Sequence, residues 1–168
     1  MGSKGINISE ECFTTQLINV HDWNGGGDHH SYVFSMENWA HLTIIISIGV
    51  ASRAAGVITV ESCSGLGASP TTTTKIPFSY YACLLDFAAG TDLLGARTNV
   101  TVAATGIVPP VATTNIRYQI ELDADQLTQG HVGFRLDVVD AGAACLASAI
   151  GIGSGGRYQS QVNATVSA

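Results

Sequence analysis

The chain has 168 residues, of which 46% are hydrophobic and only 12% are charged, and its formal net charge is −6. This length suits one domain with a substantial core. The seven Lys and Arg residues are scattered along an acidic chain, which excludes a basic surface for nucleic-acid phosphates. A charged fraction roughly half of the usual 25% cannot cover the surface, so we expect small polar residues and contacts with other subunits to do so.

The N-terminal segment, MGSKGINISEE, lacks the apolar stretch of a secretory signal. We therefore expect synthesis and folding in a cytoplasm. The longest uncharged apolar run, Leu42–Ser52, falls far short of the roughly 20 residues that span a bilayer, so no membrane segment is predicted. The four cysteines form no C-x-x-C pair, which predicts buried free thiols, with one or two disulfides as the alternative outside a cell.

Alternating apolar and polar residues predict antiparallel strands along most of the chain. In HLTIIISIGV, residues 41–50, the even-numbered apolar side chains share one face and Ile45 is the exception. NIRYQIELD, residues 115–123, and HVGFRLDVV, residues 131–139, alternate in the same way. We expect these two to pair as a hairpin, with one helical turn at Ala124–Leu127 and Gly130 as the turn residue. The strands are expected at residues 15–20, 41–50, 56–62, 76–83, 99–104, 115–123, 131–139 and 145–152.

Two segments allow more than one interpretation. Ala141–Ile150 is rich in Ala and Leu, which favours a helix, but it also alternates and glycines follow it, so we assign a strand. Leu84–Arg97 stays open between a short helix and a long crossing loop. Together the eight strands predict one all-β domain over residues 1–168, a two-sheet sandwich or jelly roll with long Gly/Thr/Pro loops. An N-terminal arm is expected over about residues 1–14 and a C-terminal tail over about residues 159–168.

One His- and Asp-rich stretch around a Gly-rich loop is the candidate metal site, because imidazole and carboxylate groups hold zinc and similar ions. Its members are His21, Asp22, Asp28, His29 and His30. Adjacent histidines in a strand point to opposite faces, and three glycines preorganise the loop poorly. We therefore predict a solvated or subunit-contacting loop and no metal site. His41 and His131 are expected at strand edges.

No catalytic constellation is recognisable in the sequence. There is no G-x-S-x-G elbow, and the nearest match, SCSGLG at residues 62–67, is predicted to be a strand that runs into a loop. GIGSGG, residues 151–156, lacks the Lys of a phosphate-binding loop. The carboxylates Glu121, Asp123 and Asp125 lack the downstream ligands of a calcium loop, which predicts a surface turn. We expect no enzyme activity, no catalytic residue, no cofactor and no metal.

Several phrases of the sequence look like a group of small tailed-phage virion proteins of the head-decoration or auxiliary capsid type. The phrases are SMENWAHLTIIISIGV, GVITVESCSG, YQIELDADQL, FRLDVVD and a Gly-rich stretch ending in Arg157-Tyr158. The resemblance covers about Ile6 to Tyr158. It implies a β-rich structural protein on the capsid surface of a virion, assembled in the host cytoplasm, with the major capsid protein and further copies of itself, a trimer above all, as partners.

The resemblance also implies no catalytic residue, and it places Met36, Trp39, Arg157 and Tyr158 as fold or interface anchors. Three alternatives remain. The first is a carbohydrate-binding or adhesion sandwich, since fold alone does not separate these classes; against it, the chain has only two tryptophans to stack on sugars. The second is a small metal-dependent β-barrel enzyme that uses His29 or His30. The third is a tail or neck subunit of the virion.

Overall fold

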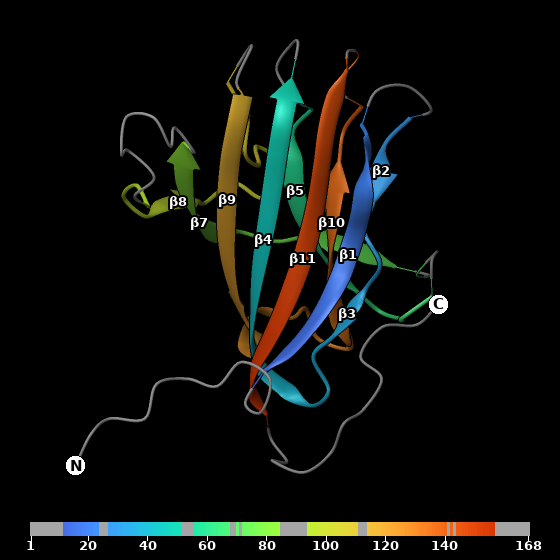
Figure 1. Ribbon diagram of the computed structural model, residues 1–168. Coiled ribbons are helices and arrows are strands. Elements are labelled where there is room, and N and C mark those ends of the chain that lie inside the picture. Colours follow the sequence, from blue (N-terminus) through green and yellow to red (C-terminus); the bar gives the residue numbers. More distant parts are fainter. Residues whose placement is uncertain are drawn as a thin grey trace, which may run out of the picture.

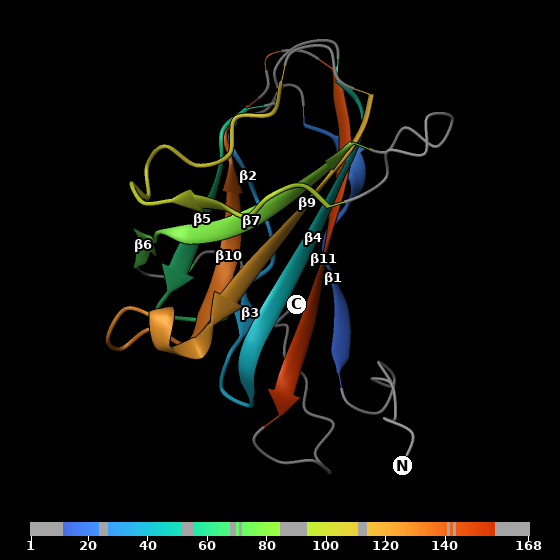
Figure 2. The same cartoon turned by 90° about the vertical axis from the view of Figure 1, so that its left-hand side faces the viewer.

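The computed structural model describes residues 12–23, 27–51, 56–67, 70, 72–84, 94–110, 114–140, 142 and 144–156. Within these ranges the chain forms strands and one short 3-10 turn, η1 (Ala124–Gln126). Two antiparallel sheets pack face to face; Figure 1 views them from the side of the larger sheet and Figure 2 after a quarter turn. The predicted all-β sandwich is confirmed. None of the described residues belongs to a helix long and apolar enough to cross a membrane.

The larger sheet, called sheet A below, has six strands. Their order across the sheet is β1 (Phe13–Asp22), β11 (Cys145–Gly156), β4 (Trp39–Ala51), β9 (Thr114–Asp123), β7 (Phe78–Leu84) and β8 (Thr98–Val100). The smaller sheet, called sheet B, has five strands. They are β2 (His29–His30), β10 (Gly133–Val138), β5 (Ile58–Cys63) and β6 (Thr73–Lys75) in that order, with β3 (Phe34–Ser35) also paired to β10.

The edges of the two sheets meet along one side of the sandwich. β1 is the edge strand of sheet A, β2 is an edge strand of sheet B, and both lie at the right in Figure 1. A backbone hydrogen bond from the Tyr32 N–H to the Leu17 carbonyl oxygen, 3.1 Å long, joins the two sides there. This line of contact, formed by β1 and residues 29–32, is called the seam below.

Alternation along the strands fills the space between the sheets with apolar side chains. Sheet A contributes the even-numbered residues 42–48 of β4 and 116–122 of β9, and sheet B contributes residues 58 and 60 of β5 and the even-numbered residues 134–138 of β10. These side chains are Leu42, Ile44, Ile46, Ile48, Ile116, Tyr118, Ile120, Leu122, Ile58, Val60, Phe134, Leu136 and Val138. Each is at most 3% exposed, so the period-two pattern seen in the sequence is the pattern of burial.

β11 is the exception in sheet A, because its core-facing side chains are small. Ala147, Ala149, Gly151 and Gly153 are buried, whereas Leu146 on the opposite face is 49% exposed. Large side chains occupy the space that these small residues leave. A Cβ atom on Gly153 would lie 2.7 Å from Phe34 Cζ and 2.9 Å from Trp39 Cδ2, so the aromatic rings pack directly on the β11 backbone.

The hairpin predicted between residues 115–123 and 131–139 is wrong. β9 pairs with β4 and β7 in sheet A, whereas β10 pairs with β2, β3 and β5 in sheet B. The connection itself is as predicted: η1 follows β9, and Gly130 adopts a φ of 82°. This turn carries the chain from one sheet to the other instead of back onto the same sheet, because both strands need an apolar face turned toward the same core.

The long predicted strands are present with shifted ends, and the chosen strand at 145–152 is confirmed as β11. β2, β3 and β6 were not predicted, since strands of two or three residues are too short to show alternation. The segment expected at 99–104 is reduced to the three residues of β8. Most of the segment left open, Leu84–Arg97, and the tail at 159–168 lie outside the described residues.

Candidate functional site

The broad outer face of sheet A is the first candidate for a functional surface. In Figure 1 no other labelled element lies in front of β1, β11, β4 and β9. Strand register aligns the outward side chains of this face in rows that run across the strands. The central row consists of Gln16, Ile150, Ile45, Gln119 and Tyr81. The two isoleucines and the tyrosine in it are partly exposed, which is unusual for the outward face of a solvated sheet.

The two rows beside the central row carry opposite charges. One row consists of Ile152, Thr43, Glu121 and Ser79, and the other of Ser148, Ser47, Arg117 and Cys83. Arg117 has its Nε buried without a hydrogen-bond partner. Because this nitrogen is buried within the chain, a partner does not reach it, and Arg117 contributes to the face through the positive charge of its guanidinium. The acidic row and the basic row therefore lie on either side of an apolar centre.

His41 forms a charged cluster at the acidic end of this face. Its Nε2 lies 2.6 Å from Glu121 Oε2, and its Nδ1 lies 2.7 Å from Asp123 Oδ1. The Thr43 hydroxyl also donates to Glu121 Oε2, over 2.8 Å. Burial opposes a charge on the ring, but the hydrogen bonds to Asp123 and Glu121 outweigh it and raise the pKa of His41. Both ring nitrogens face carboxylate oxygens, as an imidazolium requires.

The outer face of sheet B carries an ion-pair network that is largely buried. Arg135 lies opposite Glu61 in the β10–β5 register, with Nη2 and Nε at 2.7 and 2.8 Å from Glu61 Oε2. Lys75 Nζ lies 2.9 Å from Asp137 Oδ2, and His30 Nδ1 lies 3.1 Å from Asp137 Oδ1. Glu61, Arg135 and Asp137 are each at most 8% exposed.

This network satisfies its own charges. Burial tends to raise the pKa of Asp137, but the hydrogen bond and charge of Lys75, the Thr59 hydroxyl and His30 outweigh it, so the pKa is lowered. Buried charges that are fully paired are structural, because breaking a pair leaves an uncompensated charge. The outer face of sheet B is therefore internally satisfied, unlike that of sheet A.

The residues of the predicted His- and Asp-rich loop are only partly brought together. His21 Nε2 and His29 Nδ1 lie 3.3 Å apart across the seam, and the ring centroids are 5.1 Å apart. His30 points the other way, to Asp137. Asp22 accepts the Cys145 backbone N–H at 2.7 Å. Of the described residues, no group of three or more His, Cys, Asp or Glu side chains is arranged to hold a metal ion.

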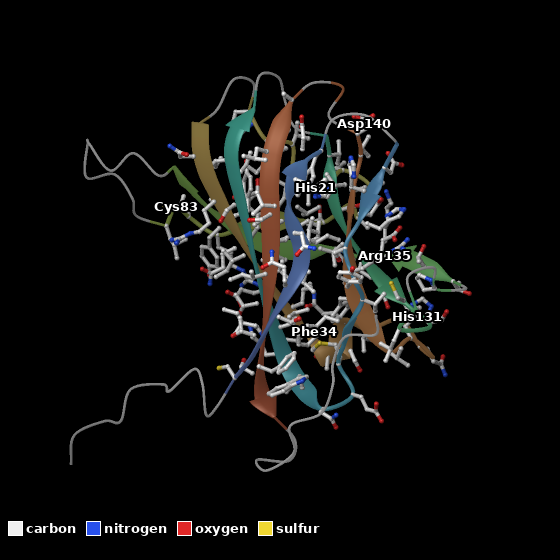
Figure 3. All side chains as sticks on the ribbon, turned by 45° about the vertical axis from the view of Figure 1, so that its right-hand side comes forward. His21, Phe34, Cys83, His131, Arg135 and Asp140 are labelled. Carbon is white, nitrogen blue, oxygen red and sulfur yellow. The ribbon has the colours of Figure 1, made fainter. Side chains whose placement is uncertain are left out.

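A shallow groove runs along the seam beside His21. Its volume is about 280 Å³, and its walls come from β1 and from the segment after β2. Its lining residues are Leu17, Ile18, Asn19, His21, His30, Ser31 and Tyr32. Figure 3 shows His21 on β1, on the side where the two sheets meet. The groove is open to water, so polar groups at its wall stay accessible to small ligands.

Ser62 and His131 form the one Ser–His contact that the described residues bring together near the SCSGLG motif. Ser62 Oγ lies 2.8 Å from His131 Nδ1, and it also accepts the Thr128 backbone N–H at 3.1 Å. Ser62 is 0% exposed, so substrate does not reach its hydroxyl. The contact fixes the turn after η1 to the end of β5. The sequence did not reveal it, because Ser62 lies on β5 and His131 lies in the connection before β10, 69 residues later.

Of the predicted anchor residues, Met36 and Trp39 lie in the described part of the chain. Met36 is 1% exposed within the core cluster, and Trp39 is partly buried against Phe13, with ring centroids 6.1 Å apart. Trp23 is also fully buried. Neither tryptophan forms an exposed platform of the kind that stacks on sugars. Arg157 and Tyr158 lie outside the described residues.

Comparison with known proteins gives little further information. No protein-family model matches the chain, and no curated protein matches it in sequence. Among solved structures, it is similar to the crystal structure of SPBc2 prophage-derived protein YomS, with 10% sequence identity and a TM-score of 0.41 over 84% of this chain and 93% of that chain. A likeness at this level carries no argument about function, so the proposals below rest on the residues described above.

Proposed function

We propose that the chain is a structural virion protein that decorates or stabilises a tailed-phage capsid through protein–protein contacts, without catalysing a reaction. The resemblance of several sequence phrases to small phage virion proteins supplies the setting. The observation that carries the proposal is the outer face of sheet A, in which partly exposed isoleucines lie between a row that contains Glu121 and a row that contains Arg117. Exposed apolar area on a low-charge chain favours contact with other subunits.

The occupant of this face is a second copy of the chain, because the face is self-complementary. Consider a two-fold axis that lies between the two faces, parallel to the central row and perpendicular to the strands. Rotation about this axis places the central row of one copy over the central row of the other. The same rotation exchanges the two neighbouring rows, so Arg117 of each copy lies opposite Glu121 of the other. Sheets stack about 10 Å apart, a gap that Arg and Glu side chains bridge together. An isologous contact of this kind needs one surface only.

The apolar centre supplies the energy of the contact, and the charges determine the strand direction of the second copy relative to the first. Ile45 and Ile150 meet their symmetry copies, and because both are already partly buried, each contributes only a fraction of the about 1.5–3 kcal/mol that complete burial of an exposed isoleucine would give. The paired Arg117 and Glu121 set the strand direction of the partner, since a parallel arrangement would place like charges together. The resemblance adds the major capsid protein as a further partner and favours a trimer, whereas a two-fold contact gives even-numbered assemblies.

Light scattering coupled to size-exclusion chromatography tests the contact on the purified full chain. We expect an even-numbered oligomer that Ile45→Asp converts to monomers, because the change buries a charge at the centre of the contact. Thr14→Asp is the matched control, since it adds the same charge at the exposed edge of the same face. A wild-type chain that stays monomeric at high micromolar concentration contradicts the self-association.

Cross-linking tests the geometry separately from the stoichiometry. A two-fold axis over the central row brings Gln119 close to its own copy, so Gln119→Cys in a Cys12→Ser background should form a covalent dimer with a short bismaleimide. Thr14→Cys in the same background should not. A trimer would refute the two-fold contact and retain the assembly proposal. Electron microscopy of virions, with antibody labelling, tests the location; particles without the protein would refute the virion role.

A further inference from the structure

The geometry points to a metal site that is independent of the proposed function: His21 Nε2 and His29 Nδ1 bind one divalent transition-metal ion, with zinc as the best fit. The two histidines lie on β1 and β2, the edge strands that meet at the seam. Their facing nitrogens are 3.3 Å apart. Neutral imidazole is the commonest metal-binding side chain, and each nitrogen without a proton offers one lone pair.

The distance between the nitrogens fits a tetrahedral ion. Zinc binds histidine nitrogen at roughly 2.0–2.1 Å, so two such nitrogens at the tetrahedral angle lie about 3.3 Å apart. The observed separation of 3.3 Å matches this value. A separation of 3.3 Å also lies within hydrogen-bond range, so the titration with Zn²⁺ described below distinguishes a shared ion from a direct N–H···N contact.

The separation of the two ring centroids is also compatible with two ligands of one ion. A five-membered ring with bonds of about 1.35 Å has a radius of about 1.15 Å. Rings that point at one ion from about 2.05 Å therefore have centroids about 5.2 Å apart, whereas rings that point straight at each other would have centroids about 5.6 Å apart. The observed centroid separation is 5.1 Å, at an interplanar angle of 64°.

The surroundings of His21 prepare its Nε2 for this role. Its other nitrogen, Nδ1, lies 3.0 Å from the Asn19 carbonyl oxygen, an acceptor that requires a proton on Nδ1. Nε2 of the neutral ring then carries the lone pair. Metal-binding histidines commonly donate their second N–H to a backbone carbonyl in this way. His21 borders the groove, so water molecules that complete the coordination would enter from the side of His21.

A bound ion would link sheet A to sheet B at their edges, because each sheet supplies one ligand. Because only two protein ligands are in place among the described residues, water fills the remaining positions and the affinity is modest, in the micromolar range or weaker. Metal binding requires neutral imidazole rings, so acidification releases the ion. The ligands come from sheet A and sheet B, and the ion therefore stabilises the closed seam but not either sheet alone.

Isothermal titration calorimetry of the full chain with Zn²⁺ tests the site. We expect one ion per chain, with binding at least about tenfold weaker in His21→Ala and in His29→Ala. His131→Ala is the matched control because that ring contacts Ser62, far from the seam, and it should bind like the wild type. Cys12→Ser should also bind normally, which excludes the accessible thiol as the ligand. Circular dichroism of each variant without metal separates loss of the site from loss of the fold.

Nuclear magnetic resonance of the imidazole nitrogens gives a readout that needs no variant. Zn²⁺ should shift Nε2 of one histidine and Nδ1 of another, and leave the remaining three rings unchanged. Any of three results overturns the site: no heat of binding up to millimolar Zn²⁺, unchanged affinity in both histidine variants, or shifts confined to other rings. None of these results bears on self-association through sheet A, and a monomeric chain would leave the metal site standing.

Discussion

Replacement of Gly153 by alanine should destabilise the sandwich out of proportion to the single methyl group added. The new Cβ would lie 2.7 Å from Phe34 Cζ and 2.9 Å from Trp39 Cδ2, closer than carbon atoms pack. Both rings are held in place, Phe34 at 0% exposure in the core and Trp39 against Phe13. Overpacking of this kind costs about 1–3 kcal/mol. For a chain of this size that lowers the Tm by roughly 2–12 °C.

Urea unfolding followed by tryptophan fluorescence measures the change. The matched control is Gly49→Ala on the neighbouring β4, where the added Cβ would meet only the Leu146 carbonyl oxygen at 3.6 Å. This substitution should be neutral or stabilising by up to about 1 kcal/mol, since alanine restricts the unfolded chain. Phe34→Leu should partly rescue Gly153→Ala in a double-mutant cycle, because a smaller side chain makes room. If Gly153→Ala unfolds at the wild-type urea concentration, the packing argument is refuted.

Three further predictions concern charged and thiol groups. Arg135→Met should cost about 3–5 kcal/mol in the same unfolding assay because it leaves Glu61 buried and unpaired, and the added substitution Glu61→Leu should restore most of that loss. The raised pKa of His41 contributes stability that is fully present below about pH 6.5 and is lost as the pH rises through the pKa of the folded state. The urea midpoint should therefore fall between about pH 6.5 and 9. His41→Gln should reduce this dependence of the midpoint on pH. Burial raises the pKa of the Cys63 thiol to about 11, so a thiol reagent at pH 8 should modify Cys12 in the folded protein and reach the three buried cysteines only after unfolding; rapid modification of all four would contradict the burial.

The long strands were predictable because their signal is local. In β4 and β9 every second side chain is apolar, and the same side chains are buried in the core. Strand pairing was less predictable, since alternation tells which face is buried and not which neighbour supplies the hydrogen bonds. The wrong hairpin between β9 and β10 has this cause. Both strands have strong patterns and a short connection, but the turn after η1 leads across the core.

The clusters on the outer faces were not predictable from spacing along the chain. His41 meets Glu121 and Asp123 because β4 pairs with β9, about 80 residues later. The sequence placed Glu121 and Asp123 correctly near a surface turn, but nothing in it indicated the histidine between them. The His21–His29 contact is closer in sequence, yet alternation along a strand indicates only which face a side chain takes and not which strand lies beside it. The actual partner is the edge strand of the other sheet.

The contrast between the two outer faces determines which of them is suited to association. On sheet B, Glu61, Arg135 and Asp137 are buried and paired within the chain, so a partner would gain little by contacting them and would have to displace their neighbours. On sheet A, Ile45 remains partly exposed and Arg117 has a buried nitrogen without a partner. Association through sheet A would remove the remaining exposed apolar area from water and place Arg117 opposite Glu121 of the second copy. If a charge introduced at a position on sheet B dissociated the oligomer while Ile45→Asp did not, this ranking of the two faces would be wrong.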